Sequence, residues 1–164
     1  MTYLALDPGG TTGWASFQPS TVRFEWGKLA TDDGDADIPG HHRALWNLLE
    51  HMHGLAYPNE YLTVICEKFN YQRRDITKGI QLELISRNYI GIVELFCKQR
   101  PKSTYLFMHE LGFKTFWLKS DKIKVVGWPT SQHERDALAH LLYHLTFTLK
   151  PPDERWLRQL HPGH

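Results

Sequence analysis

Three acidic side chains and one histidine stand where they could take part in chemistry. Asp7 follows an apolar run and precedes a Pro-Gly-Gly turn, and Glu67 ends the apolar stretch YLTVICE. His133 and Asp136 stand three residues apart in HERDALAH. Carboxylates brought together away from water repel one another unless a cation neutralises them. Sites rich in carboxylate oxygen and poor in imidazole suit Mg²⁺ or Mn²⁺ better than Zn²⁺, so a fold that gathers these residues would form a site for hard divalent cations.

The element that carries two of these residues is an amphipathic helix, expected at 132–148. Ser131 and Glu134 have the spacing of a capping box, in which each side chain bonds to the backbone near the other. One stripe is expected to face the core and contains Leu138, Leu141, Leu142, Leu145 and Leu149. A second stripe beside it contains His133, Asp136, His140 and His144. Taken alone, an aspartate in an early helical turn is usually solvated, and only its grouping with the other carboxylates favours a functional role.

The rest of the pattern predicts the elements that would position these residues. Strands are expected at 3–6 and 14–17, at 21–29 where Val22, Phe24 and Trp26 alternate with polar residues, and at 61–69 and 103–109. The stretch 61–69 is apolar almost throughout, which is typical of a strand covered on both faces. Helices are expected at 41–53 and 80–99, with a possible short helix in the basic segment after residue 109. This order predicts an α/β fold with a mixed sheet flanked by helices.

Length and composition indicate one domain. With 164 residues and 41% apolar content, the chain can bury one core, which we place at residues 1–150, followed by a short tail at 151–164. No stretch of about 18 apolar residues and no secretory signal pattern is found, so a cytoplasmic protein with no membrane partner is expected. Cys66 and Cys97 are too few for a disulfide framework and are expected to be reduced thiols.

The charge is unevenly distributed along the sequence. Residues 1–60 carry eight acidic and three basic side chains, whereas residues 61–164 carry ten acidic and sixteen basic ones. The excess is concentrated in Lys98, Arg100, Lys102, Lys114, Lys119, Lys122 and Lys124. Such a cluster suits a polyanion, and an ordinary solvated surface remains the alternative.

Three motifs, LALDPGGTTGWA, VICEKF and HERDALAH, resemble in order and spacing the acidic motifs of the RuvC-like Holliday-junction resolvases. That family lies within the ribonuclease H-like superfamily, and the resemblance, which spans residues 2–148, is to its bacteriophage-encoded members. It implies a ribonuclease H-like mixed five-stranded sheet flanked by helices. The implied activity is a structure-selective DNA endonuclease that cuts four-way junctions, or related flaps and forks, and leaves 5′-phosphates. A phage-encoded chain would act in the host cytoplasm.

The resemblance also implies a metal site. Two Mg²⁺ ions, for which Mn²⁺ could substitute, would be held by Asp7, Glu67, His133 and Asp136. Asp7 would bridge the two ions, Glu67 would bind one, and Asp136 with His133 would bind the other. Many relatives carry a carboxylate where this chain has His133, so a metal ligand and a general base are both open roles for that imidazole.

DNA contacts and a partner subunit are expected outside the metal site. Phe69 and Tyr71 could stack on unpaired bases, and the phosphate contacts would come from Arg73, Arg74, Lys78, Lys114, Lys119, Lys122 and Lys124. Because relatives are homodimers, the helix at 80–99 could form the subunit contact through Tyr89, Ile92 and Phe96. Those three side chains could equally lie against the sheet.

Two other functions are compatible with parts of the sequence. The fold could serve as a branched-DNA-binding module that does not cleave. A phosphate-binding fold of the sugar-kinase and actin type is less favoured: its first hairpin also reads Asp-x-Gly-x-Thr, but such proteins generally need two domains and a second nucleotide-binding motif, which this sequence does not provide.

Overall fold

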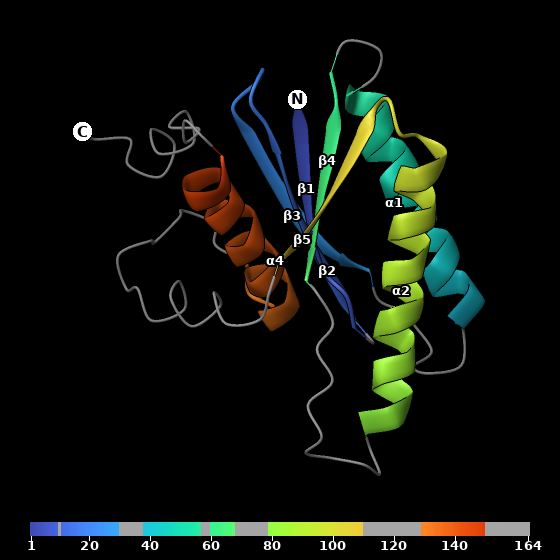
Figure 1. Cartoon of the computed structure of the whole chain (residues 1–164). Coiled ribbons are helices and arrows are strands. Elements are labelled where there is room, and N and C mark those ends of the chain that lie inside the picture. Colours follow the sequence, from blue (N-terminus) through green and yellow to red (C-terminus); the bar gives the residue numbers. More distant parts are fainter. Residues whose placement is uncertain (10, 30–37, 57–59, 68–78, 110–128, 150–164) are drawn as a thin grey trace.

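A central sheet with helices on both faces makes up the protein in a computed structural model of the whole chain (Figure 1). The structure describes residues 1–9, 11–29, 38–56, 60–67, 79–109 and 129–149. Its strands are β1 (Thr2–Asp7), β2 (Thr12–Gln18), β3 (Arg23–Leu29), β4 (Leu62–Glu67) and β5 (Thr104–His109). Its helices are α1 (Ile38–Ala56), α2 (Gly79–Gln99) and α4 (Gln132–Tyr143), which continues into η2 (His144–Thr148).

The sheet is mixed, and β1 lies at its centre. The strand order is β3-β2-β1-β4-β5. β1 pairs antiparallel with β2, which pairs antiparallel with β3, whereas β4 and β5 run parallel to β1. The predicted α/β fold with a mixed five-stranded sheet is therefore confirmed.

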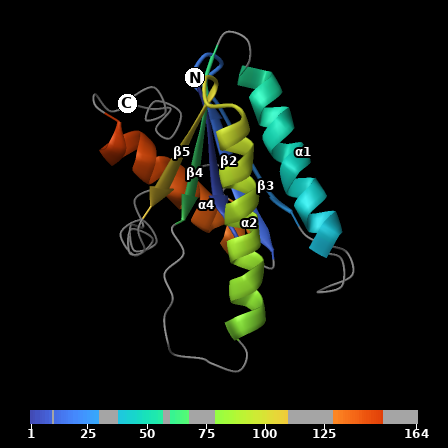
Figure 2. The same ribbon diagram turned by 45° about the vertical axis from the view of Figure 1, so that its right-hand side comes forward.

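The helices divide between the two faces of the sheet. In Figures 1 and 2, α1 and α2 lie side by side on one face and α4 crosses the other. Successive side chains of a strand point to opposite faces, so β1 supplies both cores. Leu4 and Leu6 pack with α1 and α2, while Tyr3 and Ala5 pack with α4. The central strands are thus buried on both sides, as the apolar run at 61–69 predicts for β4.

Helix α4 begins and is anchored as the sequence predicts, but it ends differently. The capping box of Ser131 and Glu134 is formed, and the leucines of the expected stripe are in the core beneath the helix. The expected single α-helix at 132–148 is wrong in its last five residues, which form a π-helix. There the Thr146 hydroxyl donates to the Leu142 carbonyl at 2.7 Å, an acceptor that the Thr146 amide would use in an α-helix.

Two roles were considered for the apolar side chains of α2: a subunit contact or packing against the sheet. Tyr89 and Phe96 are buried in the core shared with α1, and Ile92 packs against it. Burial raises the pKa of Tyr89 to about 12, so its hydroxyl stays protonated. These side chains lie against the sheet, and Tyr89 and Phe96 are not available for a subunit contact.

Arg100, at the end of α2, belongs to the expected basic cluster but has a structural role. Its guanidinium pairs with Glu50 of α1 and lies 4.0 Å from the ring centroid of Phe96. A cation held by a carboxylate and an aromatic face joins two helices, which removes Arg100 from the surface expected for a polyanion.

Two further expectations concern the thiols and the membrane. Cys66 and Cys97 are both buried and form no disulfide. Within the described ranges, no helix has the length and apolarity needed to cross a lipid bilayer. The tail at 151–164 and the possible short helix after residue 109 lie outside the described residues.

Candidate functional site

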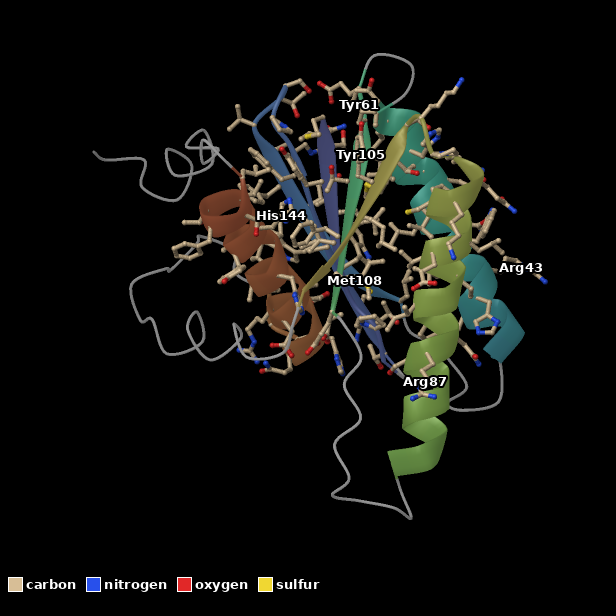
Figure 3. All side chains as sticks on the ribbon, in the orientation of Figure 1. Arg43, Tyr61, Arg87, Tyr105, Met108 and His144 are labelled. Atoms are coloured by element: carbon tan, nitrogen blue, oxygen red, sulfur yellow. The ribbon has the colours of Figure 1, made fainter. Side chains whose placement is uncertain are left out.

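Two carboxylates lie at one end of the sheet because they end adjacent parallel strands. Asp7 is the last residue of β1 and Glu67 the last of β4, and the two strands pair through Leu6 and Cys66 one residue earlier. The alternation that places Ala5 and Ile65 beneath α4 also directs Asp7 and Glu67 to the α4 face. Their side chains are 10% and 14% exposed. In Figure 3, Met108 of β5, the partner of Cys66, marks the same end of the sheet.

A glycine allows α4 to reach these carboxylates. Gly13 of β2 stands opposite Asp7, and a Cβ added there would lie 2.0 Å from the carbonyl oxygen of His133 and 2.8 Å from the amide nitrogen of Glu134. No side chain fits in that space, since real Cβ atoms do not approach backbone so closely. The first turn of α4 therefore rests directly on the sheet beside Asp7.

The closest grouping of potential ligands consists of Asp7, Glu67 and His140. Each offers one ligand atom, and these atoms lie within 4.8 Å of one another. His140 is fully buried, with Nε2 3.5 Å from a carboxylate oxygen of Glu67. Among the described residues, this is the one cluster of three or more such side chains with metal-binding spacing.

His133 and Asp136 lie near this cluster but outside it. The Nδ1 atom of His133 is 3.1 Å from Oδ2 of Asp7, and its side chain is 45% exposed. Asp136 is buried, and its Oδ1 accepts a hydrogen bond from the side-chain amide of Gln132 at 2.9 Å. Of the four residues expected to hold metal, Asp7 and Glu67 are gathered, His133 contacts Asp7, and Asp136 lies one helical turn before His140.

A buried thiol, that of Cys66, lies next to the cluster in sequence. Burial raises the pKa of the Cys66 thiol, and the carboxylates of Glu67 and Asp7 raise it further. Cys66 therefore remains a neutral thiol packed on the opposite face, and it adds neither charge nor a thiolate ligand to the site.

The donor set fits a divalent cation. Two carboxylates and one imidazole can supply oxygen and nitrogen ligands, and a cation among them would offset the repulsion between buried negative groups. Ligands of an octahedral ion at about 2.1 Å stand roughly 3 Å apart when adjacent and just over 4 Å apart when opposite. The observed spacing of up to 4.8 Å is close to that range.

Sequence reasoning placed His140 on the correct stripe but did not assign it to the site. It follows Asp136 by four residues, so one turn of helix brings both to the same side. That spacing was the available signal. The sequence does not show how far along the strands each turn of α4 lies. That position decides whether a buried histidine contacts a strand end or only core side chains.

Nine side chains are expected from the sequence to touch DNA. Phe69 and Tyr71 lie outside the described residues, as do the basic side chains Arg73, Arg74, Lys78, Lys114, Lys119, Lys122 and Lys124. Of the expected basic cluster, Lys98 and Lys102 are exposed.

Comparisons with known proteins show the fold. No protein-family model and no curated protein matches the sequence. Similar solved structures include Thermus thermophilus RuvC in complex with a Holliday junction substrate, with a TM-score of 0.64 and 15% identity over 88% of this chain and 92% of that one. Another structure of Thermus thermophilus RuvC has a TM-score of 0.56 and 16% identity, covering 93% of this chain and 98% of that one.

A third similar structure is the yeast mitochondrial Holliday junction resolvase, with a TM-score of 0.47 and 12% identity over 98% of this chain and 80% of that one. The order and direction of the five strands, together with the two RuvC structures, define the architecture. The chain therefore shares the ribonuclease H-like, mixed five-stranded fold of RuvC.

Proposed function

We propose that this protein is a divalent-metal-dependent endonuclease that resolves Holliday junctions and related branched DNA. The observation that carries the proposal is the convergence of Asp7 and Glu67, with His140, at the carboxyl ends of two parallel strands. The fold shared with a RuvC structure that holds a Holliday junction supports the choice of substrate. The sequence motifs favour a bacteriophage-type member that acts in the cytoplasm of the host.

The proposed roles follow the position of each side chain. Asp7 lies between Glu67 on one side and His133 on the other and would bind both ions. Glu67 would bind one ion, and His133 with Asp136 would bind the other. Mg²⁺ is the proposed ion, with Mn²⁺ as a substitute; when bound, the pair supplies an activated water and stabilises the leaving 3′-oxygen, which leaves a 5′-phosphate on the product.

The protein side chains hold this arrangement in place. The capping box and the contact at Gly13 fix the first turn of α4, and with it His133, against the end of β1. Gln132 orients the Asp136 carboxylate by donating to Oδ1. Side chains that are already in position need little rearrangement to stabilise the charge that develops in the transition state.

Branched DNA and a second subunit are the proposed partners. Two symmetric cuts in a four-way junction require two active sites related by a two-fold axis, which favours a homodimer. Base stacking by Phe69 and Tyr71 and phosphate contacts by the lysines and arginines named above complete the proposal.

The test compares the chain with its Asp7→Asn variant on defined DNAs in Mg²⁺ or Mn²⁺. The panel contains a four-way junction, a flap, a fork and linear duplex. We expect Asp7→Asn to lower junction cleavage at least about a thousandfold while junction binding in a gel-shift assay changes little. The matched control is Glu94→Gln, the same change at a partly exposed carboxylate of α2, which should cleave normally.

Two results would contradict the proposal. If the wild-type chain binds junctions but cleaves no member of the panel, it is a binding module and not a nuclease. If Asp7→Asn cleaves as fast as Glu94→Gln, the active site lies elsewhere.

A further inference from the structure

We propose that His140 is a direct metal ligand, and that with Asp7 and Glu67 it forms a mixed nitrogen and oxygen site that binds Mn²⁺, the substitute ion of the proposed function, more tightly than Mg²⁺. This inference deepens the proposed function and rests on it for the reaction, but the ion site can be tested without any DNA. It adds a ligand to the metal site implied by the sequence motifs, in which His140 has no role.

The first argument is the position of the imidazole. Ligand atoms of Asp7, Glu67 and His140 lie within 4.8 Å of one another, whereas Asp136, one turn earlier on α4, is not part of that group. The Nε2 atom of His140 is 3.5 Å from Oε2 of Glu67. That separation is long for a charge-assisted hydrogen bond and falls between the adjacent and opposite spacings of an octahedral ion.

The second argument is burial beside charge. His140 has no exposed surface, and it faces the ends of β1 and β4 rather than the apolar part of the core. A cation shared by the buried imidazole and the two carboxylates would be favourable, since it removes the repulsion between the two negative groups.

His144, one turn further along, is a buried histidine with different contacts. It is also buried, and Figure 3 labels it beside α4. Its ring packs against Tyr3 and Phe107, with centroids 5.9 and 4.9 Å away. The same helix thus carries one buried histidine among aromatic rings and one at the carboxylate cluster. A buried position on this helix is therefore not enough to place an imidazole beside Glu67.

The third argument is the chemistry of the donor atoms. Mg²⁺ binds almost entirely through oxygen and keeps several water ligands, whereas Mn²⁺ accepts imidazole nitrogen and lies above Mg²⁺ in affinity for mixed sites. With a neutral imidazole, the three ligands carry a charge of about −2, which matches one divalent ion. Exchange of this nitrogen for an oxygen ligand should therefore weaken Mn²⁺ binding and leave Mg²⁺ binding nearly unchanged.

The experiment detects the metal–nitrogen bond itself. In a His133→Asp background, where His140 is the one imidazole proposed to bind metal, one equivalent of Mn²⁺ is added and ¹⁴N coupling is measured by pulsed electron paramagnetic resonance. We expect coupling from one directly bound imidazole, and we expect His140→Gln to abolish it. The matched control, His144→Leu, should retain it.

Calorimetry gives an independent readout. We expect His140→Gln to weaken Mn²⁺ binding about tenfold or more, while the Kd for Mg²⁺ changes less than about threefold. His140→Leu serves as a second variant, chosen because an apolar side chain suits a buried position if glutamine unfolds the protein. Circular dichroism and urea unfolding establish that each variant is folded.

Different results separate this inference from the proposed function. If ¹⁴N coupling persists in the folded His140→Gln and His140→Leu variants, or never appears although Mn²⁺ binds, His140 only positions Glu67 and the inference is wrong. If coupling depends on His140 but no branched DNA is cleaved, the ligand assignment stands and the nuclease proposal fails.

Discussion

Asp7 is the residue on which both sides of the candidate site depend. One of its oxygens contacts His133, and it also belongs to the cluster with Glu67 and His140. Its position could be predicted, because a carboxylate at the end of a buried strand faces whatever packs across that strand end. The partner of Glu67 could not be predicted, because the choice between Asp136 and His140 depends on an offset of one helical turn.

His133 is the residue whose role the sequence leaves most open. Its Nδ1 atom is 3.1 Å from Asp7 Oδ2, which is close to the spacing of two adjacent ligands on one octahedral ion. We therefore expect it to bind metal rather than act as a general base. His133→Asp should keep cleavage within about tenfold of the wild-type rate, because a carboxylate also binds the ion, whereas His133→Ala should lose about a hundredfold or more.

The measurement is the single-turnover cleavage rate from pH 5.5 to 9. A general base of low pKa is a poor proton acceptor near neutral pH, so a base role would make His133→Asp as slow as His133→Ala. Equal rates for those two variants would contradict the ligand role.

His144 makes stability depend on pH through its burial. Desolvation lowers its pKa to about 4 from an ordinary value of 6.5, so the unfolded chain binds a proton more readily than the folded one. The contribution of His144 is complete above pH 6.5 and is lost as the pH falls towards 4. We expect His144→Leu to remove a pH-dependent part of the free energy of unfolding, on the order of 2–3 kcal/mol between pH 7 and pH 4.

Urea unfolding at several pH values measures that difference. The control is His51→Leu at an exposed position of α1, which should leave the wild-type pH dependence unchanged. Parallel curves for the wild type and His144→Leu would show that another group is responsible.

At the scale of elements, the site is produced by the way α4 crosses the sheet. Its capping box and leucine stripe could be read from the sequence, because local spacing decides both. The close contact at Gly13 could not be read from the sequence. The stretch GGTTG contains three glycines that could each serve a turn, and only the three-dimensional fold shows which one contacts a helix. The π-helical ending was also missed, since leucine spacing does not distinguish it from an α-helix.

Gly13→Ala tests this contact directly. The added Cβ would lie 2.0 Å from the His133 carbonyl oxygen, so α4 must move away from β2. We expect a loss of about 2–3 kcal/mol in the free energy of unfolding, and a cleavage rate at least tenfold lower because His133 and Asp136, the proposed ligands, shift. The measurements are urea unfolding and junction cleavage by the same preparation.

Gly91→Ala is the matched control. A Cβ at this exposed helical position of α2 meets nothing within 4 Å, and alanine favours a helix over glycine by about 0.5–1 kcal/mol. That variant should be slightly more stable and fully active. A Gly13→Ala protein with wild-type stability and rate would mean that α4 does not rest on β2 as described.

At the scale of the molecule, the fold was predictable because pattern and topology agree. Two hairpin connections and two helical crossovers leave few arrangements, and the almost fully apolar β4 requires cover on both faces. Helix periodicity could not decide between a subunit contact and core packing for α2, and the stripe with Tyr89 and Phe96 is in the core. An apolar helical stripe has the same pattern whether it faces a sheet or another subunit.

Paired cutting tests the homodimer and the active site together. Two differently tagged copies, one wild type and one Asp7→Asn, are co-expressed and purified through both tags. On a supercoiled plasmid with a cruciform, the wild-type dimer should make both cuts during one encounter and give linear DNA, whereas the mixed dimer can make one cut and should give nicked circles. The wild-type dimer carrying both tags is the control. A monomer would yield no doubly tagged protein. Linear product from the mixed dimer at the wild-type rate would mean that the Asp7→Asn subunit still cuts or that one active subunit makes both cuts.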